Sequence, residues 1–357
     1  MKIVFVANLK NPSASGRQRL WAMQQCNEEV YILDKSRFLP KLGRFAGHVA
    51  KVLKQPALMH NSTAVGKALI ELCTDLKPDI IWIEWATDLK QDVLNQLHQL
   101  SPRPLLISFQ DDNPWGDRHG DKWLWKNYFK IVPLFDLHLV KRKNDMDNLS
   151  ALGANNFRVW RHGVYNPLFH PPTTPAVKKY PVSFVGTCID ERAELVEYLL
   201  VNKIPLHVFG NRWRQRSNLP ERFPANFHPA AEGRDYAEVI QQSQVCLGLV
   251  SHSNKDEWTM RTYEVPGCAG MLLIERTPTH EVLFNDDEEA AFFSSPQECL
   301  EKLQNLLANP VRCDVMGNAA YQKCKANHWM LEDEMQRLLN EIRVNKDKQT
   351  LTSSAVQ

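Results

Sequence analysis

The segment DEWTMRTYEVPGCAGMLLIE, residues 256 to 275, places charged and aromatic residues directly before small residues and an apolar strand. Arg261 and Glu264 are three residues apart and therefore share one face of a short helix. One interpretation is a surface ion pair, worth under about 1 kcal/mol. The other is a division of labour, in which the guanidinium grips a diphosphate and the carboxylate accepts hydrogen bonds from ribose hydroxyls. Only the second interpretation predicts a nucleotide site.

Two glycines at predicted strand ends favour a ligand at the same edge of the sheet. Gly186, in FVGTCIDER, and Gly210, in VFGNRW, each close an apolar run just before a helical one. A glycine has no Cβ, so a phosphate can approach its backbone, and the next helix offers unpaired N–H groups. Strand ends also carry glycine for turns alone, which leaves each glycine open to either interpretation. Neither belongs to a G-x-G-x-x-G motif, so a dehydrogenase gains no support.

The segment QDDNPWGDRHGD, residues 110 to 121, follows another predicted strand and carries candidate bases. Its position at the carboxyl end of that strand predicts that its acids lie at the ligand edge. Asp111, Asp112 or His119 could remove the proton of an attacking hydroxyl if the reaction inverts the carbon under attack. The same residue types also form ordinary turns. Two adjacent acids are weak support for a metal cage, so no metal is expected.

These candidates are carried by alternating β-rich and helical segments, the pattern of a doubly wound parallel sheet. The N-terminal half has five such runs, which predict one sheet, and the C-terminal half has four more, which predict a second. The predicted strands are 2–8, 29–33, 79–85, 104–109 and 136–140, then 182–186, 206–210, 245–250 and 271–275. The expected fold class is therefore α/β, with two Rossmann-like domains.

Proline separates the two series. The segment 165 to 181 holds five prolines and little periodicity, so we expect it to be extended. The predicted organisation is an N-terminal domain at 1–170, a linker at 171–181, a C-terminal domain at 182–326, a helix at 327–345 and a disordered tail at 346–357.

The composition excludes several classes of protein. A chain of 357 residues with 43% hydrophobic and 24% charged residues is typical of a water-soluble globular protein with two domains. A net charge of +2 gives no general attraction to nucleic acid. The eight cysteines are scattered, without the spacing of a metal site or a disulfide framework, and neither a signal peptide nor a membrane span is evident. We expect reduced thiols and a cytoplasmic protein.

The segment 256–284 resembles the signature of the spore-maturation, or CgeB-like, glycosyltransferases, in which R-x-x-E precedes a proline, small residues and an apolar strand. SFVGTCIDER, VFGNRW and FFSSPQECLEKL add to the similarity, which covers most of 180–325. The resemblance implies a GT-B fold, in which two Rossmann-like domains face each other across a cleft and the C-terminal helices can return to the N-terminal domain. It also implies transfer of a sugar, of the hexosyltransferase type, from a nucleotide-diphosphate donor held by the C-terminal domain.

The resemblance extends to individual residues. Asp256 and Glu264 are separated by seven residues, similar to the E-x7-E pattern of many GT-B enzymes, although aspartate is shorter than glutamate by one methylene. Glu264 would hold the ribose, and Asp256 would face the sugar or the diphosphate. The residues expected to bind the nucleotide sugar are Gly186, Thr187, Arg192, Gly210, Arg214, Asp256, Arg261 and Glu264. The nucleotide sugar is a co-substrate, and no cofactor is implied.

The acceptor is a hydroxyl compound of unidentified class, whether carbohydrate, lipid-linked or protein. Two other functions remain open at this point. A nucleotide-sugar epimerase on the same fold would need no acceptor, and an inactive GT-B-like module would bind a nucleotide or a partner without turnover.

Overall fold

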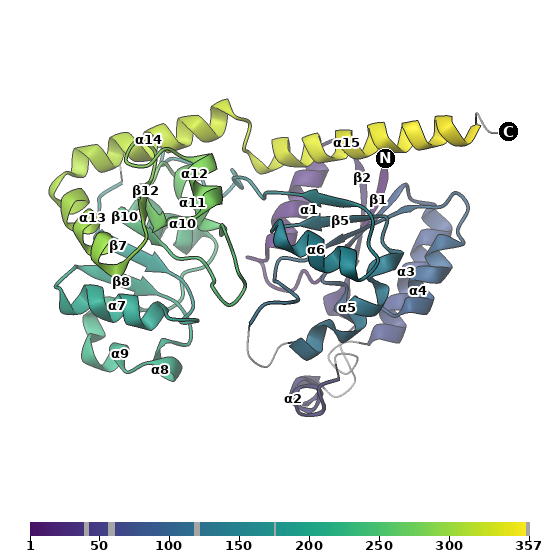
Figure 1. Cartoon of the computed structure of the whole chain (residues 1–357), viewed down its shortest axis with the longest axis horizontal. Coiled ribbons are helices and arrows are strands. Elements are labelled where there is room, and N and C mark those ends of the chain that lie inside the picture. Colours follow the sequence, from purple (N-terminus) through teal and green to yellow (C-terminus); the bar gives the residue numbers. More distant parts are fainter. Residues whose placement is uncertain (39–42, 56–60, 118–121, 175, 355–357) are drawn as a thin grey trace. The chain divides into compact units, whose positions relative to one another are not determined.

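The computed structural model describes residues 1–38, 43–55, 61–117, 122–174 and 176–354. The chain forms two compact units, one made of Met1–Arg161 with Met335–Gln357 and the other of His162–Glu334 (Figure 1). Each unit is built on one sheet of six parallel strands with helices beside it. The two sheets confirm the α/β class and the pair of doubly wound domains.

The N-terminal sheet has the strand order β2-β1-β3-β4-β5-β6. Its order reverses between β1 and β3, which is the point where such sheets bind ligands. The strands are β1 Lys2–Ala7, β2 Glu29–Asp34, β3 Ile80–Glu84, β4 Leu105–Phe109, β5 Leu137–Val140 and β6 Phe157–Val159. The α-helices are α1 Ser15–Gln25, α2 Gly43–Leu53, α3 Ser62–Leu76, α4 Gln91–His98, α5 Lys126–Ile131 and α6 Asn144–Ala151, with short 3-10 turns that include η3 Ala86–Asp88.

Side chains on both faces of this sheet are buried, as parallel strands covered by helices require. On one face, Val4 and Ile81 join a core with helix residues such as Leu69. On the other face, Phe5 and Trp82 lie with their ring centroids 6.5 Å apart. Trp82 is fully buried and belongs to this core.

The C-terminal sheet has the order β12-β11-β10-β7-β8-β9. Its strands are β7 Tyr180–Val185, β8 Leu206–Phe209, β9 Phe227–His228, β10 Ser243–Gly248, β11 Leu272–Glu275 and β12 Ala291–Phe293. Its helices are α7 Arg192–Val201, α8 Trp213–Arg216, α9 Leu219–Arg222, α10 Arg234–Gln241, α11 Arg261–Gly267, α12 Pro278–Leu283, α13 Pro296–Ala308 and α14 Pro310–Ala326. The order reverses between β7 and β10, so the carboxyl ends of these two strands mark the expected ligand edge.

Alternate residues of this sheet enter two separate cores. Leu247 and Leu273 pack in one core with α7 and α13. Cys246 and Leu272 pack in the other with α11 and α14. This alternation is the two-residue period of a strand whose faces are both covered.

The last helix, α15 Leu331–Ser354, returns to the N-terminal unit from Met335 onward, as the fold prediction stated. Arg158 pairs with Glu341 at 2.7 Å, and Arg343 pairs with Glu28 at 2.5 Å. The helix extends through residue 354, where a disordered tail from 346 was expected.

The other differences concern short elements. The predicted five-strand N-terminal sheet has a sixth strand, β6, and the C-terminal sheet gains β9 and β12. The chain passes from one compact unit to the other at residues 161 and 162, before the linker expected at 171–181. Residues 180 and 181 of that linker already belong to β7. Pro266 lies inside α11. Within the described residues, no helix is long and apolar enough to cross a membrane.

Candidate functional site

The carboxyl ends of β7 and β10 bring several of the predicted residues together in the C-terminal unit. Val185 ends β7, and Gly186 and Thr187 follow it in the chain. The loop after β10 leads through Asp256 to α11, which begins at Arg261. This arrangement follows directly from the topology, because parallel strands end at one edge.

Arg261 reaches the end of β7. Its Nε donates to the Val185 carbonyl at 2.7 Å, and its Nη2 donates to the same oxygen. The guanidinium carbon lies 5.6 Å from the centre of the Phe184 ring. Among the residues that the structure describes, Nη1 donates no hydrogen bond, and the side chain is partly exposed. Arg261 is therefore held in place by two nitrogens while the third can contact a ligand.

Glu264 does not form the surface ion pair with Arg261 that its spacing allowed. Its Oε2 accepts a hydrogen bond from the Tyr236 hydroxyl at 3.0 Å, and only 8% of the residue is exposed. Burial raises the pKa of Glu264 to about 7, although nearby Arg261 and the Tyr236 hydroxyl oppose that rise. The pKa of Tyr236 lies well above its usual 10, because of burial and the adjacent carboxylate. Tyr236 therefore stays a neutral donor at physiological pH.

Close packing requires glycine at both Gly186 and Gly210, which the sequence did not reveal. A Cβ on Gly186 would lie 2.9 Å from Arg261 Nη2 and 2.7 Å from the Phe184 ring. A Cβ on Gly210 would lie 2.0 Å from the Gly186 carbonyl oxygen. Gly186 makes room for the arginine, and Gly210 lets the end of β8 pack against the backbone after β7. The Gly186 carbonyl also accepts a hydrogen bond from Trp213 Nε1 at 3.0 Å.

Arg192 lies in the interior rather than in the open site. It is 7% exposed, and it donates to the carbonyls of Thr187 at 3.0 Å, Leu249 at 3.3 Å and Val250 at 3.1 Å. These bonds tie the loop after β7 to the loop after β10. Burial, with a smaller contribution from the charge of Arg261, lowers the pKa of Arg192 to about 10. Two guanidinium groups held this close repel each other, so an anion beside them is stabilised.

The remaining predicted donor residues differ in exposure. Arg214 lies on α8 and is exposed, whereas Thr187 and Asp256 are partly buried. The Asp256 N–H donates to the Ser251 carbonyl at 3.0 Å, and the Asp256 charge opposes the lowered pKa of Arg192.

A histidine at this edge was missed by the sequence analysis. His252 contacts the carboxylates of Glu191 and Glu275, the second at 3.4 Å. The hydrogen bond with Glu275 raises the pKa of His252. The sequence could have indicated His252, because SHSNKD directly follows a predicted strand.

The equivalent edge of the N-terminal sheet is occupied by a buried ionic cluster. Arg19, only 1% exposed, pairs with Glu84 and with Asp111, the latter at 3.0 Å. Ser15 donates to the same Asp111 oxygen at 2.7 Å. Burial alone would lower the pKa of Arg19, but the two carboxylates reverse this effect and raise it. Gly16 belongs to the same cluster, because a Cβ there would lie 2.7 Å from Glu84 Oε2.

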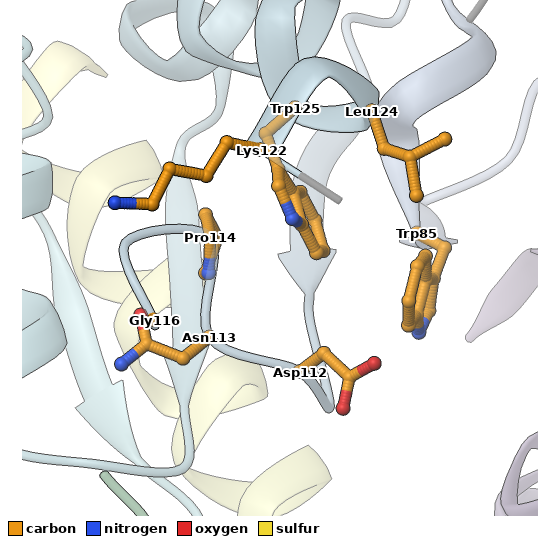
Figure 2. A pocket seen from close by; sticks show the side chains of 8 residues that line it. All are labelled: Trp85, Asp112, Asn113, Pro114, Gly116, Lys122, Leu124 and Trp125. Atoms are coloured by element: carbon orange, nitrogen blue, oxygen red, sulfur yellow. The ribbon is translucent and has the colours of Figure 1, made fainter. Parts of the chain in front are cut away.

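Asp111 and Asp112 consequently have different surroundings. Asp111 pairs with the buried Arg19, so its carboxylate is already engaged by a cation. Asp112 instead lines a pocket of about 110 Å³ whose walls include Trp85 and Trp125 (Figure 2). His119, the third candidate base, lies outside the described residues. Within the described part of the chain, no three His, Cys, Asp or Glu side chains are placed to hold a metal ion.

Comparison with known proteins agrees with this architecture. Residues 192–340 match the protein family described as "Glycosyl transferase-like". No curated protein matches the sequence. The structure is similar to a sucrose-phosphate synthase from Thermosynechococcus elongatus, with a TM-score of 0.66, 12% identity and coverage of 98% of this chain and 100% of that one.

Two further solved structures are similar over almost the whole chain. Anabaena Alr3699/HepE in complex with UDP-glucose gives a TM-score of 0.64 at 11% identity, covering 96% of this chain and 100% of that one. A putative UDP-N-acetylglucosamine 2-epimerase from Listeria monocytogenes gives 0.53 at 14% identity, covering 97% of each chain. The fold is that of the GT-B glycosyltransferases. The family match, to glycosyl transferase-like proteins, agrees with this fold.

Proposed function

We propose that this protein transfers a sugar from a nucleotide-diphosphate donor to a hydroxyl acceptor. The acceptor oxygen forms a bond to the anomeric carbon, and the bond from that carbon to the β-phosphate oxygen breaks. The nucleoside diphosphate leaves with the extra negative charge. Stabilising that charge is the largest contribution that such a site can make to the rate.

The observation that carries this proposal is the position of Arg261. Its guanidinium is fixed at the end of β7 by the Val185 carbonyl, with Nη2 beside Gly186, and among the described residues Nη1 donates no hydrogen bond. A diphosphate at the same edge would accept from Nη1 and from backbone N–H groups of the loop after β7. Arg192 would act as a positioning residue, since its hydrogen bonds join the two loops that border this edge.

Glu264 would hold the ribose through its carboxylate oxygens. Ribose hydroxyls can donate hydrogen bonds, and an ionised carboxylate can accept them. Tyr236 already donates to Oε2, and among the described residues Oε1 accepts no hydrogen bond. On this basis Glu264 contacts the nucleoside directly, and Tyr236 orients it.

Asp112 is the proposed base for the acceptor hydroxyl. It lies at the carboxyl end of β4 and lines a pocket, while neighbouring Asp111 is paired with Arg19. This assignment fits an inverting reaction, in which a separate base receives the proton.

Isothermal titration calorimetry on the full chain tests the donor site. We expect one of UDP, GDP, ADP, CMP or dTDP to bind. Arg261→Ala and Glu264→Ala should each raise Kd by about 10- to 100-fold, because each removes charge-assisted hydrogen bonds. Arg312→Ala and Glu301→Ala, on the surface of α14 and α13, are the matched controls. Unchanged affinity in both site variants would refute the assignment.

A product assay separates glycosyl transfer from the other functions. The protein is incubated with nucleotide sugars, with and without a cell extract that supplies acceptors. Transfer requires the extract, an epimerase converts the donor without it, and a binding module produces nothing.

The proposal has three further parts: membership of the CgeB-like group, a hexose as the transferred sugar, and a cytoplasmic location. The eight buried free thiols fit a reducing compartment.

A further inference from the structure

His252 lies between two carboxylates that belong to different parts of the C-terminal unit. It is in the loop after β10, and one of its ring nitrogens, Nδ1, contacts Glu191 Oε1. The other nitrogen, Nε2, lies 3.4 Å from Glu275 Oε2. Glu191 ends the loop after β7, directly before α7, and Glu275 is the last residue of β11. His252 therefore joins two loops and a strand end at the edge where we place the diphosphate.

This geometry fits the protonated ring. A neutral imidazole has one N–H donor, and its second nitrogen carries a lone pair. With a carboxylate at each nitrogen, the neutral ring would direct that lone pair at an anion, whereas the imidazolium can donate to both carboxylates. Glu275 is held independently of His252, because its Oε2 also accepts a hydrogen bond from the Val250 N–H at 2.8 Å. The hydrogen bond with Glu275 raises the pKa of His252, and burial opposes this rise.

Charged groups on three elements adjoin the His252 ring. Asp190 and Glu275 both favour its charged form. The neighbouring arginines are already bound, Arg192 to backbone carbonyls and Arg276 to carboxylates of α12 and the loop after it. The charged residues of these elements are Asp190, Glu191 and Arg192 around the start of α7, Lys255 and Asp256 in the loop of His252, and Glu275 and Arg276 at the end of β11. The carboxylates among them stabilise a proton on His252.

The two loops that His252 joins carry residues that we propose to bind the donor. Gly186 and Thr187 begin the loop that Glu191 ends. Asp256 follows His252 in the other loop, and the turn between them is closed by the Lys255 N–H, which donates to the His252 carbonyl at 2.9 Å. A change in the contacts of His252 therefore acts on both loops.

The other contacts between these loops do not change near neutral pH. Ser251 Oγ donates to Asp190 Oδ2 at 3.1 Å, and Arg192 donates to the carbonyls of both loops. Burial opposes ionisation of Asp190, but hydrogen bonds from Ser253 and Ser251 outweigh it and hold the pKa of Asp190 below its usual value. Arg192 has a pKa of about 10. A rise from about pH 6 to about pH 9 therefore leaves these contacts in place and removes the charge of His252.

We infer that protonated His252 is a positioning residue for the donor, which holds the loop after β7 beside the loop after β10, and that loss of its proton weakens donor binding. This inference rests on the proposed function, because it concerns the regulation of the same donor site. Its effect is opposite to that of Glu264, whose ionisation strengthens ribose binding as pH rises. Donor affinity should therefore be highest at intermediate pH.

Isothermal titration calorimetry on the full chain at pH 6 and pH 9, with the tightest-binding of UDP, GDP, ADP and dTDP, tests the inference. His252→Gln removes the charge and should raise Kd by about 3- to 5-fold at pH 6, a modest factor because the side chains of His252 and Glu191 are 51% and 50% exposed. At pH 9, where the wild-type ring is neutral, the variant should match the wild type. The ratio of the two Kd values at each pH cancels the ionisation of the nucleotide and of Glu264.

Two further variants complete the pH comparison. His252→Arg keeps a cation that can donate to both carboxylates, so it should bind about as tightly as the wild type at pH 6 and more tightly at pH 9. His48→Gln, at an exposed histidine of α2 in the N-terminal unit, is the matched control and should follow the wild type at both pH values. Melting temperatures recorded at the same pH values report whether each variant is folded.

Glu191→Gln separates positioning from direct contact with the diphosphate. If His252 acts through Glu191, this substitution weakens binding at pH 6 in the wild-type background and adds nothing in His252→Gln. An equal effect in both backgrounds, or no effect in either, would overturn the inference. A Kd ratio for His252→Gln that is the same at pH 6 and pH 9 would also overturn it, while the donor assignment would stand. If the wild-type protein binds none of these nucleotides, the proposed function fails, and this inference fails with it.

Discussion

Glu264 is expected to destabilise the ligand-free protein at alkaline pH. It is almost fully buried, and its pKa is about 7 instead of the 4.5 of an exposed glutamate. Between pH 4.5 and about pH 7, Glu264 therefore keeps its proton in the folded state but has lost it in the unfolded state. Because the folded state binds more protons in this window, stability falls as pH rises from about 4.5 to about 7.

The size of the effect follows from the same two values. A rise in pKa from 4.5 to about 7 corresponds to about 3 kcal/mol, which is an upper estimate. Glu264→Gln keeps the shape and an acceptor for the Tyr236 hydroxyl but cannot ionise. At pH 5 the variant and the wild type should melt at similar temperatures. At pH 8.5 the variant should melt at a temperature about 6 to 12 °C higher, given the usual 2 to 4 °C per kcal/mol for a domain of this size.

The assay is the melting temperature by circular dichroism, recorded from pH 5 to pH 8.5. Glu301→Gln, on the exposed side of α13, is the control and should follow the wild type throughout. Parallel curves for Glu264→Gln and the wild type would refute the reasoning, because they would show that Glu264 ionises in the folded state as readily as in water. The same substitution should weaken nucleotide-sugar binding at pH 8, since the ionised carboxylate is the better acceptor for ribose hydroxyls.

Two substitutions test the packing beneath the two sheet edges. Arg19→Met leaves Glu84 buried without its partner and should lower the unfolding free energy by about 3 to 5 kcal/mol in urea denaturation, whereas exposed Arg17→Met should change it little. Gly210→Ala puts a methyl group 2.0 Å from a backbone oxygen, so it should cost about 1 to 3 kcal/mol or more in the same assay, whereas Gly47→Ala, with open space around it, should not destabilise. Equal stability of either site variant and its control would contradict the packing described.

The main features of the fold could be predicted from the sequence because its long strands are buried on both faces. Runs such as those of β1, β3 and β4 are apolar at nearly every position, which only a covered parallel strand explains. Strands β6, β9 and β12 have two or three residues each, too few to show any period.

The candidate donor site was predictable as a set of residue types but not as a set of contacts. Arg261 and Glu264 share a helix, yet each bonds to a different element, Val185 at the end of β7 and Tyr236 on α10. Nothing in the local sequence indicates Tyr236, which is brought to Glu264 only by the packing of α10 against the sheet. Arg192 shows the same limit, because its position near a strand end did not indicate that it donates to backbone carbonyls of two loops.

The buried arginines at the two sheet edges have different partners, and this difference supports separate roles for the two edges. At the N-terminal edge, Arg19 is surrounded by the carboxylates of Glu84 and Asp111, so that cation has no capacity left for an anionic ligand. At the C-terminal edge, Arg192 and Arg261 lie on the same Phe184 ring, at 5.7 and 5.6 Å, and are bound to carbonyl oxygens that carry no net charge. Two cations whose hydrogen bonds go to neutral carbonyls stabilise an added anion more than a cation that is paired directly with two carboxylates does. The diphosphate is therefore expected at the C-terminal edge, and an uncharged hydroxyl compound at the N-terminal edge.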